Sequence, residues 1–214
     1  MPLSCRVAIA LAAALALGAS ASVFADGNAA RGKILSYTCL GCHGIEDYRN
    51  AYPNYTVPRL GGQHADYIVA ALKEYRAGTR THPTMHVQAS TLSDQDMQDI
   101  AAYFSGETPI QASTQTRGTP PAKVTQLCAS CHGKDGVGIS SAYPTLKGQH
   151  ADYLEQALDE YRHQYTDEDR KNPVMSTFAA GLTADDISEI AEYYSAQSPG
   201  LKTLYRRLTI LSAK

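Results

Sequence analysis

One series of motifs occurs twice in this 214-residue chain, and the duplication restricts the possible folds more than any other feature. The pentapeptide Cys-x-x-Cys-His occupies residues 39–43 and again 128–132, and the hexapeptide Gly-Gln-His-Ala-Asp-Tyr occupies residues 62–67 and 148–153. A Pro-x-Met tripeptide follows at 83–85 and at 173–175. Because the order is the same in both series, the sequence predicts a duplicated domain of about 90 residues rather than a solenoid of short repeats.

Both halves carry helical patterns and no pattern typical of strands. Apolar residues recur at i, i+3, i+4 and i+7 over residues 68–75 and 97–104, and again over 154–161 and 187–194. Ser93 and Thr183 stand at N-cap positions, each with an aspartate three residues later. The predicted fold class is therefore all-α.

The N-terminal residues have the features of a secretory signal. Arg6 precedes an apolar run at residues 7–17, which is too short to cross a bilayer as a helix, and small residues precede Asp26. We expect residues 1–25 to be removed as a signal peptide, in preference to a retained membrane anchor; cleavage after Ala21 is a second possibility. Cys5 would leave with this segment.

The expected joint between the halves is a polar segment at residues 106–121, which contains three prolines and lacks helical periodicity. We expect an N-terminal domain at 26–107, a linker at 108–120 and a C-terminal domain at 121–214. The chain has 19 Lys and Arg against 21 Asp and Glu, so no basic surplus is available to neutralise phosphates. Nucleic acid is therefore not expected as a partner.

The cysteine spacing points to a covalently bound cofactor. Thiols at i and i+3 lie on one helical turn, where each can form a thioether with one haem vinyl group, and the histidine that follows faces the iron. A zinc site would bring the two cysteine pairs together, a thioredoxin-like dithiol would need a βαβ context, and a structural disulfide is the third alternative. The sequence predicts two haem c groups, held by Cys39, Cys42, Cys128 and Cys131, with iron ligands His43 and His132.

An electron-transfer haem takes a second axial ligand from the protein, usually Met or His. Met85 and Met175 occupy matched positions, each two residues after a proline, and we predict that they bind iron from a loop before the last helix of each half. Met97 has no counterpart and lies on an apolar helical face, which predicts core packing. Bis-histidine ligation by the matched pair His64 and His150 remains the main alternative, although we expect both at the surface or as helix caps.

Further residues are candidates to support the haem. His86 lies beside a candidate methionine and is expected to be an exposed loop histidine, with iron ligation in the first half as its alternative. A proximal imidazole normally donates its other N–H to a carbonyl. Pro58 and Pro144 are candidates to provide that carbonyl, with a plain turn as the alternative. Tyr103 and Tyr193 are expected to pack either on the haem or in the core.

Two segments differ from the repeat. The charged run at residues 166–171 is expected to be a solvated loop, or else to alter the second haem edge or a docking face. Residues 201–208 are basic and amphipathic, and we expect a terminal helix packed on its own domain. Peripheral contact with a membrane or an acidic partner is the alternative for this segment.

The duplicated Cys-x-x-Cys-His, the Pro-x-Leu-x-Gly segments at 58–62 and 144–148 and the late Pro-x-Met tripeptides resemble tandem class I cytochrome c domains. The resemblance covers nearly all of the chain after residue 25 and is closest to the dihaem cytochrome c4 family. It implies two His/Met haems in domains that face each other across a pseudo-twofold axis.

The same resemblance implies a periplasmic electron carrier, a monomer or weak dimer, whose partners are a quinol-oxidising complex and a terminal oxidase. Such a carrier is not an enzyme. The alternative is a haem subunit of a dehydrogenase, or a dihaem peroxidase or sulfur-compound dehydrogenase.

Overall fold

The computed structural model describes residues 27–205 except 53, 107–109 and 164–169. Within these ranges the chain forms helices, turns and two isolated bridges, Arg49 with Thr56 and Gly61 with Lys202. The predicted all-α class is confirmed. None of the helices in the described ranges has the length and apolar character needed to cross a membrane. The predicted signal peptide at 1–25 lies outside the described residues.

The first half contains α2 (Ala29–Leu35), α3 (Leu40–His43), α4 (Ala65–Ala77), α5 (Pro83–Ser90) and α6 (Asp94–Ser105). Helix α6 packs against α2 and α4, and α4 also packs against α5. The buried face of α6 is the apolar stripe seen in the sequence. Met97 on this face is fully buried in the core of the first half, so its predicted packing role is confirmed.

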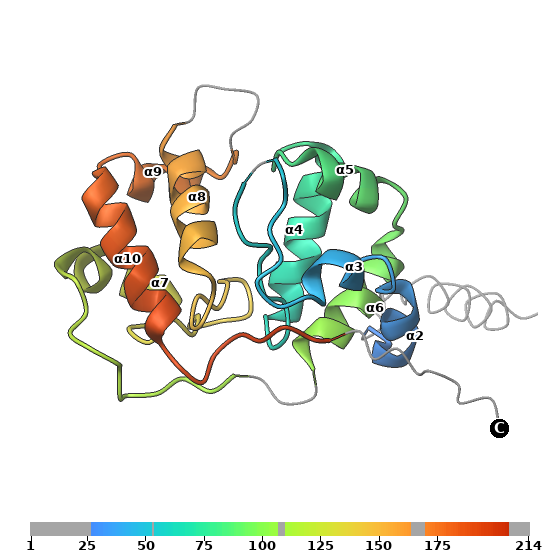
Figure 1. Cartoon of the computed structure of the whole chain (residues 1–214), viewed down its shortest axis with the longest axis horizontal. Coiled ribbons are helices and arrows are strands. Elements are labelled where there is room, and N and C mark those ends of the chain that lie inside the picture. Colours follow the sequence, from blue (N-terminus) through green and yellow to red (C-terminus); the bar gives the residue numbers. More distant parts are fainter. Residues whose placement is uncertain (1–26, 53, 107–109, 164–169, 206–214) are drawn as a thin grey trace, which may run out of the picture.

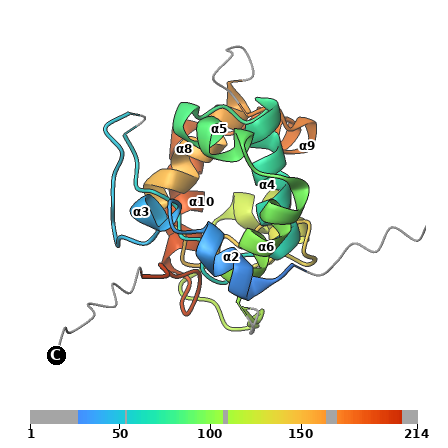
Figure 2. The same ribbon diagram turned by 90° about the vertical axis from the view of Figure 1, so that its right-hand side faces the viewer.

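The second half contains the π-helical turn η2 (Val124–Cys128), then α7 (Ala129–His132), α8 (Ala151–Arg162), α9 (Pro173–Ala179) and α10 (Ala184–Ala196). Helix α8 packs against α9 and α10, and η2 packs against α7. This half has its own buried core, centred on α10 and α8. Figure 1 shows the halves side by side, and Figure 2 shows the first half in front of the second.

The helix starts follow the local sequence. Ser93 with Asp96, and Thr183 with Asp186, form the predicted capping boxes at the starts of α6 and α10. The two Pro-x-Met tripeptides, however, begin the short helices α5 and α9 and are not loops. A proline at the first helical position lacks only an N–H that would have no intrahelical partner, so these prolines start a helix instead of preventing one.

The chain after α10 differs from the prediction. Residues 201–205 are not helical and lie against the first half (Figure 1). The backbone N–H and C=O of Lys202 bond to Gly61, at 3.0 and 2.9 Å, and Leu204 packs on the core of the first half. The expected terminal helix on its own domain is wrong here, because the backbone groups of this segment are paired with Gly61 and, through Leu201, with Lys147. Residues 206–208 lie outside the described ranges.

The expected solvated loop at 166–171 is described only at its end. Arg170 is 4% exposed; its Nε donates to Glu160, and its guanidinium lies over the rings of Tyr153 and Tyr161. The expectation is therefore wrong for Arg170, because an anion and two aromatic faces compensate its burial. Lys171 is exposed, and its backbone N–H donates to the Thr79 carbonyl across the boundary between the halves.

The segment between α3 and α4 runs along this boundary (Figure 1). Tyr55 from this segment belongs to the core cluster of the second half and lies 5.9 Å, between ring centroids, from Tyr153. Asp152 accepts bonds from the backbone N–H and the hydroxyl of Thr56 and pairs with Arg49 at 3.1 Å. The halves are thus joined by buried and ionic contacts as well as by the covalent chain.

Candidate haem-binding sites

Each half has one cavity beside its Cys-x-x-Cys-His segment. The cavity of the first half measures about 180 Å³ and that of the second about 350 Å³. Both are far larger than the voids of a close-packed interior, and apolar side chains make up most of their walls. The structure brings all eight candidate haem residues to these cavities: Cys39, Cys42, His43 and Met85 to the first, and Cys128, Cys131, His132 and Met175 to the second.

The two candidate iron-ligand histidines, His43 and His132, are held in one tautomer. Nδ1 of His43 lies 2.8 Å from the carbonyl oxygen of Pro58, and Nδ1 of His132 lies 3.1 Å from that of Pro144. A carbonyl only accepts, so each Nδ1 donates and each Nε2 keeps its lone pair. The expected roles of Pro58 and Pro144 are confirmed.

Burial lowers the pKa of both His43 and His132, and the hydrogen bonds to the proline carbonyls partly oppose this effect. The neutral imidazole is therefore favoured at neutral pH. A neutral imidazole with a free Nε2 is the form that binds a metal.

The cysteines lie on one helical turn in each half. The backbone N–H of His43 donates to the carbonyl of Cys39, while Cys128 ends η2 and Cys131 lies in α7. All four are free thiols, which excludes the disulfide alternative in this structure. Burial raises the pKa of Cys39 and raises that of Cys128 to about 11. A dithiol redox motif needs a lowered thiol pKa, so the sites do not fit that chemistry.

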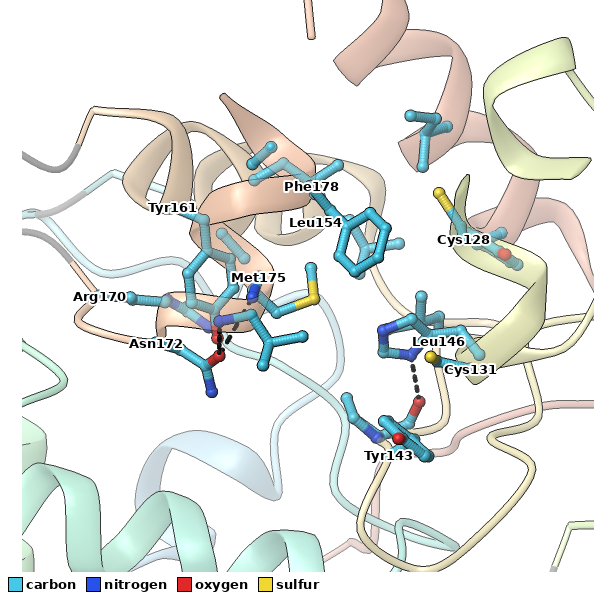
Figure 3. Close-up of a pocket in the computed structure, with 18 of the residues that line it drawn as sticks. Cys128, Cys131, Tyr143, Leu146, Leu154, Tyr161, Arg170, Asn172, Met175 and Phe178 are labelled. Carbon is cyan, nitrogen blue, oxygen red and sulfur yellow. Dashed lines mark hydrogen bonds between the residues drawn. The ribbon is translucent and has the colours of Figure 1, made fainter. Parts of the chain in front are cut away.

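Each candidate methionine lines the same cavity as the cysteines of its half. Figure 3 shows the sulfur of Met175 pointing into the second cavity from α9, with Cys128 and Cys131 on the opposite wall. The backbone N–H of Met175 donates to Oδ1 of Asn172 at 3.1 Å. In the first half the N–H of Met85 donates to Nδ1 of His82 at 3.3 Å. Each methionine is therefore positioned by the N-cap residue of its own short helix.

The other histidines are not placed as iron ligands. His64 and His150 line neither cavity. Nδ1 of His64 bonds to the Ser140 carbonyl across the boundary, and the side chain of His150 is 10% exposed and faces Asp47. Neither ring caps its helix. The expected capping position is confirmed, because His64 and His150 are the N-cap residues of α4 and α8, but their rings make contacts at the boundary between the halves instead of a capping bond.

His82 also lines the first cavity, a position not predicted from the sequence. Its Nδ1 accepts the N–H of Met85, so its Nε2 carries the proton and offers no lone pair. The N-cap role of His82 could have been predicted, because this residue directly precedes a proline that starts a helix. His86 is exposed, as expected, but it lies on α5 and bonds to the Tyr75 carbonyl.

The core alternative is confirmed for Tyr103 and Tyr193: Tyr193 is buried in the core of the second half, and Tyr103 packs against the core of the first. Phe104 lines the first cavity and Tyr194 the second, whereas Tyr103 and Tyr193 line neither. The apolar stripes in the sequence end on Phe104 and Tyr194, so the periodicity indicated that these two side chains face inward. The hydroxyl of Tyr194 donates to the carbonyl of Gly133 at 3.0 Å.

Two buried arginines lie beside the cavities. Arg80 was not predicted, whereas Arg170 belongs to the charged run whose alternative role was to alter the second haem edge. Arg80 and Arg170 are each 4% exposed and line the first and second cavity respectively. Arg80 donates to the hydroxyls of Tyr153 at 2.8 Å and Tyr67 at 3.1 Å, while its buried Nε has no partner among the described residues. The two arginines are separated by the same 90 positions as the two methionines, which was the available signal.

The chain is similar to known proteins in both sequence and structure. The cytochrome c family profile matches residues 29–106 and again 122–196. Cytochrome c4 of Pseudomonas aeruginosa is 34% identical over 190 residues, covering 84% of this chain and 93% of that protein. The thiosulfate dehydrogenase electron acceptor of Stutzerimonas stutzeri is 30% identical, covering 73% and 77% respectively. The crystal structure of reduced cytochrome c4 from Pseudomonas stutzeri superposes with a TM-score of 0.60 at 29% identity, covering 82% of this chain and 100% of that one.

Proposed function

The chain belongs to the cytochrome c family, and within it to the dihaem cytochrome c4 group, and from that premise we propose that it carries electrons between redox proteins with one c-type haem in each half. The observation that carries this proposal is the matched pair of cavities, each lined by two cysteines, a histidine whose Nε2 is free to bind and a methionine. The protein is an electron carrier and not an enzyme.

The residues present fit haem. The Nε2 lone pairs of His43 and His132 are left available by the bonds at Nδ1. The buried Nε of Arg80 in the wall of the first cavity lacks an acceptor, and a haem propionate would provide one. An unsatisfied buried donor costs about 1–3 kcal/mol, and a carboxylate acceptor would remove that cost.

Each residue would have a defined role. Cys39 and Cys42 would hold the first haem, and His43 and Met85 would be its axial ligands. Cys128 and Cys131 would hold the second, with His132 and Met175 as ligands. When bound, each haem supplies a one-electron ferric/ferrous couple. The histidine and methionine of each half would then bind the iron, the apolar walls would exclude water, and Met ligation would raise the reduction potential relative to bis-His.

Spectroscopy of the purified protein tests the ligand set. We expect two covalent haems per chain by the pyridine haemochrome assay and the charge-transfer band of Met-ligated ferric haem c. Met85→Ala and Met175→Ala should each remove about half of this band, an estimate that follows from one Met-ligated haem per half. A full band in either variant would show that the ligand at that site is not the proposed methionine.

Partners and location are part of the proposal. We place the protein in the periplasm, after removal of residues 1–25, as a monomer or weak dimer with domains at 26–107 and 121–214 joined by 108–120. It would take electrons from a quinol-oxidising complex and pass them to a terminal oxidase. Reduction by the isolated donor complex, followed by oxidation by the oxidase, is the direct test.

A second candidate function is electron acceptance from one dehydrogenase. It is favoured by the similarity to a relative named as the electron acceptor of thiosulfate dehydrogenase. The two functions differ in the donor, so the rate of reduction by thiosulfate dehydrogenase, compared with the rate with a quinol-oxidising complex, distinguishes them. Turnover of thiosulfate or peroxide by the protein alone would instead indicate an enzyme.

A further inference from the structure

Two buried glutamines, one in each half, form hydrogen bonds with backbone groups of the opposite half. The side-chain amide of Gln149 accepts the backbone N–H of Arg59 at 2.9 Å and donates to the Arg59 carbonyl at 3.0 Å. The amide of Gln63 makes the same two bonds with Thr145, at 2.8 and 3.0 Å. The paired bonds are reciprocal, as the implied pseudo-twofold arrangement requires.

Both side chains are fixed in place. Gln63 and Gln149 are 4% and 3% exposed, and each Oε1 also accepts the backbone N–H of the histidine that follows it. Because one end of each amide meets N–H groups and the other meets a carbonyl, the orientation of each amide is determined by its partners. A buried amide whose oxygen and nitrogen both have hydrogen-bond partners resists rearrangement, because breaking one bond leaves a desolvated polar group.

The peptide units that bond to the glutamines are the same units whose carbonyls accept the hydrogen bonds of the proximal histidines. In the peptide unit between Pro58 and Arg59, the carbonyl accepts the Nδ1–H of His43 while the N–H donates to Gln149. The unit between Pro144 and Thr145 accepts from His132 and donates to Gln63 in the same way. Each proximal imidazole is thus connected, through one peptide group, to a side chain of the opposite half.

Hydrogen bonds on the two sides of one amide strengthen each other, because donation by the N–H increases the negative charge on the carbonyl oxygen. A stronger acceptor at Nδ1 increases the basicity of the imidazole. A more basic ligand stabilises the ferric iron and lowers the reduction potential at that site.

We propose that Gln149 and Gln63 are positioning residues that act across the boundary: Gln149 lowers the reduction potential of the site in the first half, and Gln63 that of the site in the second. The inference rests on the proposed haem ligation by His43 and His132. The contact between the halves therefore contributes to both reduction potentials, and the potential of each half depends on a glutamine of the other.

The test uses Gln149→Met and Gln63→Met in the full-length dihaem protein, because methionine keeps the length of the side chain and removes all three hydrogen bonds of the amide, the two to the opposite half and the one to the next histidine. Each variant is the control for the other, and because both glutamines also line the first cavity, a direct effect on that cavity is common to the two variants. Potentiometric titration gives the two potentials, which are assigned to halves with Met85→Ala. The proposal predicts a higher potential in the first half for Gln149→Met and in the second half for Gln63→Met. The expected shift is about threefold in the equilibrium constant with a one-electron partner, about 30 mV.

The crossed pattern is the decisive result. A shift in the half that carries the substitution, an equal shift in both halves, or no shift overturns the proposal. Asp152→Ala weakens the contact between the halves without touching either peptide unit, and it should produce no selective shift. Small-angle scattering checks that the halves of each variant remain docked. Two reversible one-electron potentials in the unmodified protein would uphold the proposed function even if the crossed pattern is absent.

Discussion

At the scale of single residues, two different side chains position the two candidate methionines in the same way. His82 and Asn172 both precede a helix-starting proline, and both accept the backbone N–H of the methionine three residues later. An acceptor at the N-cap satisfies an N–H that has no partner within the helix. The requirement at this position is therefore an acceptor of suitable length, and the identity of the residue is secondary.

Substitution at His82 tests this requirement. His82→Asn should keep the free energy of unfolding close to that of the unmodified protein, because asparagine makes the same cap at residue 172. His82→Ala should lower it by about 1 kcal/mol, the usual cost of a lost cap. Chemical denaturation of the holoprotein measures both. Equal destabilisation by the two substitutions would show that the ring, and not its acceptor, matters.

At the scale of elements, the long helices are specified locally and the short ones are not. Helices α6 and α10 each begin with a capping box and bury one apolar stripe, so their starts and buried faces follow from the sequence. Helices α3 and α7 are only four residues long. Helices this short are not stable alone, because one turn fixes several residues for a single hydrogen bond. They depend on the surrounding fold.

The capping boxes provide a test at this scale. Ser93→Ala and Thr183→Ala should each lower the free energy of unfolding by about 1 kcal/mol, since each removes the acceptor for an N–H at the helix start. Ser90→Ala is the control, because this exposed hydroxyl bonds only to the Val87 carbonyl, and it should change stability by less than about 0.5 kcal/mol. Denaturant titration of the three variants measures these differences. A loss for Ser90→Ala as large as for Ser93→Ala would contradict the assignment.

At the scale of the whole molecule, the contacts that join the halves include the one around Tyr55, Asp152 and the glutamines and the one made by the terminal residues that return to Gly61. The terminal contact makes the stability of the first half depend on residues at the far end of the chain.

Leu204 tests that dependence. Leu204→Ala should lower the free energy of unfolding of the first half by about 1–2 kcal/mol, less than a fully buried leucine because the side chain is only partly buried. Lys202→Ala is the matched control, because its bonds to Gly61 come from the backbone and its side chain is exposed. Calorimetry of both variants measures the effect. A larger loss for Lys202→Ala would contradict the packing argument.

The contact between the halves should also depend on pH. Burial pushes the pKa of Asp152 upward, but the hydrogen bonds from Thr56 and the charge of Arg49 hold it below its usual value. A carboxyl group whose pKa is lowered contributes stability above its unfolded pKa, about 3.9, and loses it as the pH falls through the lowered value. Docking should therefore weaken below about pH 4.

Small-angle scattering across this range measures the docking. Asp152→Asn removes the titrating group and should flatten this part of the pH dependence. An unchanged dependence in Asp152→Asn would assign the effect to other carboxyl groups.

The sequence by itself determined the duplication, the helical class, the capping boxes and the eight residues that meet at the two cavities. These follow from local periodicity and from motif spacing, which one half of the chain specifies without reference to the other. The tertiary structure alone decided the contacts made by the histidines at 64 and 150, by Arg80 and Arg170 and by residues 201–205. Their roles depend on contacts between segments far apart in the chain, where burial and an available partner override the usual preference of charged and polar residues for the surface.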